Sequence, residues 1–148
     1  MQDLTSIEVT VGDRAMDEEF DLELSSEEIE NFDWSNVDWD IPLRGIPSEI
    51  QTDSIRAWAE SEINIKAVYI YGSRLFQTHR EQSDLDIAVM LDVAHEYAYP
   101  DFLLSRKAWS AQLNKLTKHK VHLQLAHPAA SPEVWSYLLR GAGLAYQK

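Results

Sequence analysis

The chain reads GSRLFQTHREQSDLD from Gly72 to Asp86, between two apolar runs at residues 67–71 and 87–91. Apolar runs of this length, bounded by turn residues, are typical of buried β-strands. The Gly-Ser pair predicts a tight turn into a short helix, and the backbone N–H groups of such a turn can bind phosphate oxygens. The order strand, turn, short helix, strand therefore decides the fold of this part of the chain.

Asp84 and Asp86 are separated by one residue at the start of a predicted strand over about residues 84–91. Side chains two residues apart on a strand lie on the same face, so both carboxylates are expected on one face together with Ala88 and Met90. The alternate positions are aliphatic, as in a strand with one buried face. Two carboxylates so placed can share a hard cation such as Mg²⁺, whose other ligands are substrate phosphates.

These motifs resemble the signature of the polymerase-β-type nucleotidyltransferases. In particular, they resemble the minimal nucleotidyltransferases, or MNT proteins, which are often paired with HEPN proteins in prokaryotic toxin–antitoxin modules. The resemblance covers roughly residues 46–148. It implies an enzyme that uses Mg²⁺ or Mn²⁺ and transfers a nucleoside monophosphate, AMP if ATP is the donor, to a hydroxyl group. The acceptor implied by the family is a tyrosine of a HEPN-type toxin, with this chain as the antitoxin.

The resemblance also implies roles for individual residues. Asp84 and Asp86 are the expected catalytic residues and metal ligands, and Gly72 and Ser73 are expected to hold the phosphates. Two interpretations of Arg74 stay open, because its guanidinium group either neutralises phosphate charge or belongs to the protein surface.

Two departures from the family pattern leave the activity open. Leu75-Phe76-Gln77 stands where relatives usually have a second glycine. The predicted third strand, residues 121–125, offers His122 and Gln124 where active relatives place a third carboxylate, so the obvious general base is missing. The leading hypothesis is an active nucleotidyltransferase, and the alternative is a catalytically degenerate protein that acts by binding a partner. A small-molecule transferase of the antibiotic-modifying kind is disfavoured, because no second domain is visible.

Charge divides the chain in two. Residues 1–40 hold 14 acidic residues and one arginine, a net charge of −13, whereas residues 41–148 hold 11 acidic and 12 basic residues, a net charge of +1. We therefore predict an acidic arm over residues 1–41 and a nucleotidyltransferase-like domain over residues 42–148. The arm is expected to be weakly ordered or packed along the domain.

Three functions of the arm stay open. It is a solubilising tail, a segment that blocks the nucleotide pocket, or a partner-binding segment anchored by its aromatic residues Phe32, Trp34 and Trp39.

The remaining periodicities predict helices and strands in alternation. They place helices at about residues 47–62, after Gly72, from Asp101 to about residue 118, and from Ser131 to the glycines at 141 and 143, with strands at about residues 66–71, 84–91 and 121–125. The fold class is thus α/β (α+β), with a small mixed sheet of about three to four strands flanked by helices.

Several functional classes are disfavoured. The chain has no cysteine, no apolar run long enough to cross a membrane and no visible signal peptide, so a cytoplasmic protein is expected. The acidic arm would repel nucleic acid. His79, His95, His119 and His127 lack metal-ligand spacing and are expected on the surface or in loops.

Overall fold

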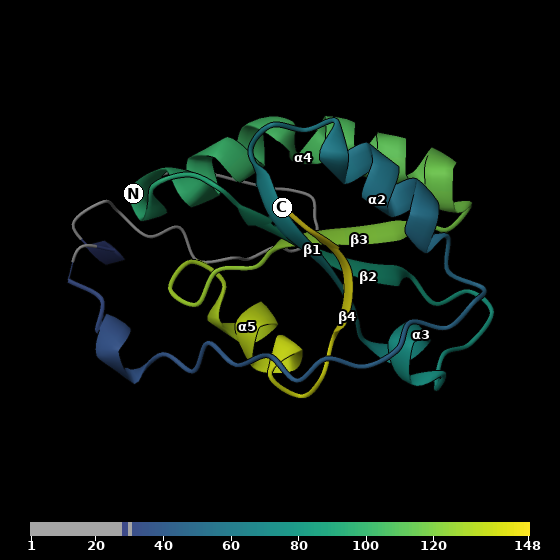
Figure 1. The fold of residues 1–148 in the computed structure, drawn as a ribbon, viewed down its shortest axis with the longest axis horizontal. Helices are drawn as coiled ribbons and strands as arrows, with labels where there is room; N and C mark the ends of the chain where they lie inside the picture. The colour runs from purple at the N-terminus through teal and green to yellow at the C-terminus, as the bar shows by residue number, and fades with distance from the viewer. Residues whose placement is uncertain (1–27, 30) are drawn as a thin grey trace, which may run out of the picture.

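The computed structural model describes residues 28, 29 and 31–148 of the chain (Figure 1). The strands are β1 (Ile65–Tyr71), β2 (Leu85–Leu91), β3 (Val121–Leu125) and β4 (Gly143–Gln147). The helices are the 3₁₀ helix η1 (Trp34–Asn36) and the α-helices α2 (Thr52–Glu60), α3 (Ser73–Phe76), α4 (His95–Thr117) and α5 (Pro132–Leu138). Among these described residues, no helix is both long and apolar enough to cross a membrane.

The four strands form one mixed sheet in the order β3-β2-β1-β4. Strand β1 runs antiparallel to β2 and β4, whereas β2 and β3 are parallel because α4 forms the crossover between them. The predicted class, a small mixed sheet of three to four strands flanked by helices, is therefore confirmed.

Helices cover the two faces of the sheet unequally (Figure 1). The long helix α4 and helix α2 pack on one face, where the aliphatic side chains of β2 join a core that includes Ile55, Phe102 and Leu113. The short helix α5 packs on the other face, over Tyr71 and Ala88. The face predicted to carry the acidic residues is thus the one that α5 covers only in part.

Two helices begin elsewhere than the sequence predicts. Residues 47–50 form a turn, closed by a 3.1 Å hydrogen bond from the Ile50 N–H to the Pro47 carbonyl, so α2 begins only at Thr52. Helix α4 begins at His95, six residues before the predicted cap, and runs through Pro100. Burial of its first turns against the core, Ala98 and Tyr99 included, outweighs the hydrogen bond that proline cannot donate.

The position of the fourth strand is not evident from the sequence, where the glycines at 141 and 143 indicate only the end of the last helix. Gly141 does turn the chain, with a φ of 131° that favours glycine. Gly143 then begins β4, which pairs with β1 from Gly143 opposite Ile70 to Gln147 opposite Ala67.

The described part of the acidic arm packs on the domain. We call residues 31–44 the strap, because they run along α5 toward α3 (Figure 1). The Ala142 N–H donates to the Pro42 carbonyl and the Arg44 N–H donates to the Ala142 carbonyl, both at 2.9 Å. The Trp135 indole N–H donates to the Asp38 carbonyl at 3.0 Å. These contacts hold the strap along the domain, and residues 1–27 of the arm lie outside the described residues.

Candidate functional site

Gly72 joins β1 to α3 in a backbone conformation that excludes other residues. Its φ of 80° and ψ of −163° lie in a region populated essentially by glycine alone. A Cβ atom there would collide with the Asp86 Oδ2 atom and would lie 3.0 Å from Asp86 Cγ. The register of β1 and β2 explains the contact, since Tyr71 pairs directly with Asp86. The Gly-Ser turn and the second aspartate, 14 positions apart in sequence, therefore meet in one site.

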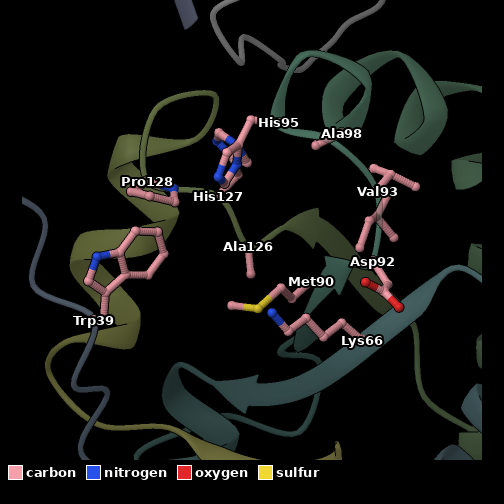
Figure 2. Close-up of a pocket in the computed structure, with 11 residues that line it drawn as sticks. Trp39, Lys66, Met90, Asp92, Val93, His95, Ala98, Ala126, His127 and Pro128 are labelled. Carbon is pink, nitrogen blue, oxygen red and sulfur yellow. The ribbon is translucent and has the colours of Figure 1, made fainter. Parts of the chain in front are cut away.

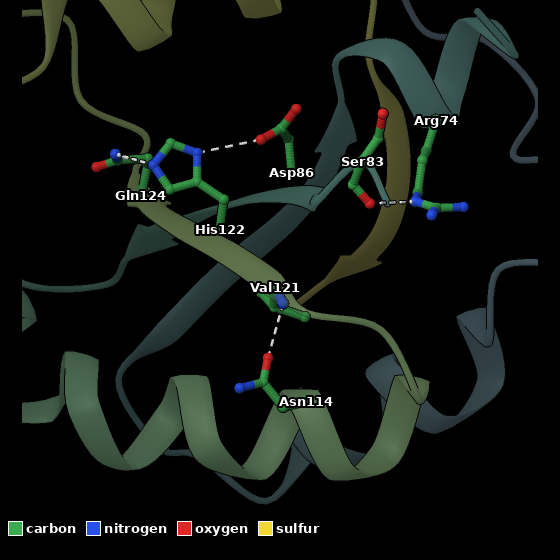
Figure 3. A network of polar contacts seen from close by, with 7 residues as sticks. All are labelled: Arg74, Ser83, Asp86, Asn114, Val121, His122 and Gln124. Carbon is green, nitrogen blue, oxygen red and sulfur yellow. Dashed lines mark hydrogen bonds and ion pairs between the residues drawn. The ribbon is translucent and has the colours of Figure 1, made fainter. Parts of the chain in front are cut away.

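Strand β3 contributes two polar side chains to the same face (Figure 3). His122 pairs with Asp86 and Gln124 pairs with Ala88 across the parallel ladder. The Gln124 Nε2 atom lies 2.9 Å from His122 Nε2, so the amide donates to this nitrogen and the His122 proton lies on Nδ1. His122 Nδ1 donates in turn to Asp86 Oδ1 at 3.1 Å, and Gln124 Oε1 is buried with no protein partner.

Arg74 does not lie on the surface, so that interpretation is wrong. It is buried, with 8% of its area exposed, and donates from Nε to the Ser83 carbonyl and from Nη2 to the Glu81 carbonyl, each at 2.9 Å (Figure 3). These bonds fold the loop between α3 and β2 back onto α3. Since that loop leads directly into Asp84, Arg74 positions the first carboxylate.

Asp84 precedes the first residue of β2 and is half-buried. Within residues 28–148, residue 30 excepted, no three His, Asp or Glu side chains converge as a complete metal cluster. Asp84 and Asp86 nevertheless fit a Mg²⁺ ion, because this cation is commonly held by one or two carboxylates together with substrate phosphates. A cation at this site would depend on the nucleotide for its remaining ligands.

Comparison with known proteins places this site in a family. The family described as "Polymerase beta, Nucleotidyltransferase" matches residues 53–146, well over half of the chain. The chain belongs to the polymerase β nucleotidyltransferase family. The match spans Gly72, Asp86 and His122, so the family assignment covers every element that builds the site.

The same fold occurs in a solved structure described as "Crystal structure of the toxin-antitoxin with AMP-PNP". The two chains share 18% sequence identity with a TM-score of 0.52, over 66% of this chain and 73% of the other. No curated protein matches this chain in sequence.

A second polar cluster of this chain was not predicted from the sequence. His127 lies in a loop as expected, yet it is buried, and its Nδ1 accepts hydrogen bonds from the N–H groups of Ala129 and Ala130 at 3.2 and 3.0 Å. Its proton therefore lies on Nε2, which donates to His95 Nδ1 at 3.1 Å. Burial, with a smaller contribution from His95, lowers the pKa of His127 to about 4.

The strap covers this histidine pair. The ring of Trp34 stacks on His95 with centroids 4.0 Å apart, and its edge meets His127 at 5.6 Å. Phe32 packs edge-to-face on Trp34, while Trp39 packs edge-to-face on Trp135 of α5. The aromatic residues predicted to anchor a partner thus contact the chain's own domain. No spacing signal joins His95 to His127, because they are 32 positions apart and meet only through tertiary packing.

Proposed function

We propose that this chain is a Mg²⁺- or Mn²⁺-dependent nucleotidyltransferase that transfers AMP from ATP to a hydroxyl group of a partner protein. The observation that carries the proposal is the contact of the Gly72 turn with Asp86. It brings a phosphate-binding turn and a metal-binding carboxylate to one place, and phosphoryl and nucleotidyl transfer depend mainly on positioning and charge neutralisation.

Each residue of the site then has a defined task. Asp84 and Asp86 hold the cation, which when bound neutralises phosphate charge and polarises the scissile bond. Gly72 and Ser73 hold the phosphates through backbone N–H groups that the first turn of α3 leaves without intrahelical partners. Arg74 stabilises the loop that leads to Asp84 through its hydrogen bonds to two loop carbonyls.

His122 is the proposed substitute for the missing carboxylate. A neutral imidazole can accept a proton, so His122, beside Asp86, is the proposed general base on the acceptor hydroxyl; its Nε2 takes that proton once the Gln124 amide has turned away. The proton it already carries is held by Asp86, and Gln124 fixes the orientation of its ring.

The partner class rests on the structural neighbour and the family resemblance. That neighbour is described as a toxin–antitoxin with AMP-PNP, an analogue of ATP. We propose that this chain is likewise the antitoxin of such a module, localised in the cytoplasm, and that its acceptor is a hydroxyl group of a HEPN-type toxin.

One observation favours the binding-only alternative. Neither polar side chain of β3 is an acid, and His122 occupies Asp86 Oδ1, an oxygen that a metal would need. A protein of this kind would neutralise its partner by contact without transferring a nucleotide.

Intact-mass spectrometry of the partner after incubation with ATP and Mg²⁺ separates the two functions. Incubation with the wild type should increase the mass of the partner by one AMP group, and EDTA should prevent this increase. Asp86→Asn should reduce the transfer rate at least about 100-fold, because it removes charge stabilisation needed in the transition state.

Asp92→Asn is the matched control. It makes the same change in an exposed aspartate just after β2, and it should leave transfer unchanged. If the wild type binds the partner yet transfers nothing with ATP or other nucleotides, with either Mg²⁺ or Mn²⁺, the binding-only alternative is correct.

A further inference from the structure

A second concave site lies at the opposite end of β2 from Asp86. It is a cavity of about 180 Å³ between the strap, the end of β2, the start of α4 and the loop after β3 (Figure 2). Trp39 stands on one side, and the side chains of Met90 and Lys66 extend toward it (Figure 2). Met90 lies four residues beyond Asp86, about 13 Å along a strand, and α5 packs on the sheet between them. The cavity is therefore separate from the proposed nucleotide site.

The apolar walls of this cavity suit a flat ring. Trp39 is 51% exposed and lines one side of the cavity, and the polarisable thioether of Met90 also belongs to the lining. Ala98, Ala126 and Pro128 complete the apolar lining. An apolar cavity of about 150 Å³ can hold a benzene molecule, so this volume fits one ring with a small substituent.

The charged groups of the cavity leave one cation unpaired. Asp92 accepts from the Lys148 ammonium group at 3.0 Å, which compensates its charge. The Lys66 side chain, in contrast, makes no ion pair or hydrogen bond within the described part of the chain. Lys66 is exposed, and a ligand that supplies a negative charge could pair with its ammonium group.

The histidine pair supplies a second donor. Because His127 donates its only proton to His95 Nδ1, the proton of neutral His95 must lie on Nε2. This N–H has no partner among the residues that the structure describes. The cavity therefore has Trp39 on one side, with the Lys66 ammonium group at one end and His95 at the other (Figure 2).

We propose that this cavity is a binding site for a small planar carboxylate, a single aromatic ring bearing one carboxylate group. The ring lies between Trp39 and Met90, and the carboxylate accepts a hydrogen bond from Lys66. Because Trp39 belongs to the strap, the bound ligand also holds the strap on the domain.

Benzoate and benzamide form a matched pair of probes, equal in shape but different in charge. In ¹H–¹⁵N NMR titrations of the full chain, benzoate should shift the amide signals of Asp92, Ala126 and His127. Lys66→Gln should weaken the binding of benzoate at least about tenfold, since a charge-assisted hydrogen bond is lost, and should leave the binding of benzamide unchanged. Lys107→Gln makes the same charge change on the exposed side of α4 and should leave both probes unaffected.

Two further variants test the location. Trp39→Ala removes the aromatic wall, and Ala126→Met fills the cavity while keeping the strap residues intact; each should abolish binding of benzoate. The proposal is overturned if benzoate shifts no amide of the cavity up to about 10 mM, or if benzamide binds as tightly as benzoate. It is equally overturned if Ala126→Met binds benzoate normally, or if AMP-PNP displaces benzoate. None of these results depends on nucleotide transfer.

Discussion

The two ends of strand β2 are built by different kinds of contact. At its start, the arrangement is local: the Gly72 turn, the Arg74 bonds to the loop and Asp86 all lie within 15 residues of sequence. At its end, rings from the strap, α4 and the loop after β3 meet across up to 93 residues, from Trp34 to His127. The first region therefore depends on backbone conformation, and the second on packing and on the protonation of one buried histidine.

The strongest test of this difference is at Gly72. Gly72→Ala should lower the free energy of unfolding by about 3 kcal/mol or more, because it adds backbone strain and a collision with Asp86. Urea denaturation measures the loss. Gly45→Ala is the matched control, since a Cβ at Gly45 meets no atom within 4 Å, and it should change stability by less than about 0.5 kcal/mol.

Repeating Gly72→Ala in the Asp86→Ala variant separates the backbone strain from the collision with Asp86. In Asp86→Ala the carboxylate no longer occupies the space of the Cβ, so Gly72→Ala should cost at least about 1 kcal/mol less there than in the wild type. Equal costs in both backgrounds would mean that the turn and the carboxylate do not depend on each other, which would contradict the site as described.

The local region is also the part that sequence reasoning recovered. The period-two alternation of β2 placed Asp86 and Ala88 on one face, and the alternation of β3 placed His122 and Gln124 on one face of their own strand; the pairing of β3 with β2 is a tertiary contact that the structure shows. The two alternations follow from strand geometry alone. The position of Arg74 stayed open, because a motif does not show whether a guanidinium group turns outward or toward loop carbonyls.

The long-range region could not be read from sequence for a physical reason. The strap packs on α5, and β4 pairs with β1, because of contacts between segments that no local pattern links. Likewise, the burial of Ala98 and Tyr99 extends α4 through Pro100 against its local preference. Tertiary contacts of this kind override propensity.

The second test, of intermediate size, addresses the protonation of His127. Its pKa of about 4 in the folded state lies below the ordinary value of 6.5, so the unfolded chain binds the proton more readily. The resulting stability is present above pH 6.5 and is lost as the pH falls toward 4. Lowering the pH from 7 to 5 should therefore cost about 2 kcal/mol from this group, measured by urea denaturation.

His127→Asn supplies the control for the pH test. Its amide oxygen can still accept from the N–H groups of Ala129 and Ala130, but the side chain does not titrate. The variant should lose about 2 kcal/mol less than the wild type between pH 7 and pH 5. A variant with the same pH dependence as the wild type would show that His127 is not the group responsible.

The smallest expected effect concerns the stack of Trp34 on His95. Aromatic pairs contribute about 0.5–1.5 kcal/mol beyond the area they bury, so a double-mutant cycle of Trp34→Leu and His95→Leu at pH 7 should give a coupling energy in that range. The same variants should speed hydrogen exchange at the Arg44 and Ala142 amides, which join the strap to the domain. Trp34→Leu with Tyr97→Leu is the control cycle, because Tyr97 is 58% exposed and makes no ring contact with Trp34, and it should be additive. An additive result for the first cycle would mean that the stack of Trp34 on His95 does not hold the strap, which would then depend on its backbone hydrogen bonds and on the contacts of Trp135 with Asp38 and Trp39.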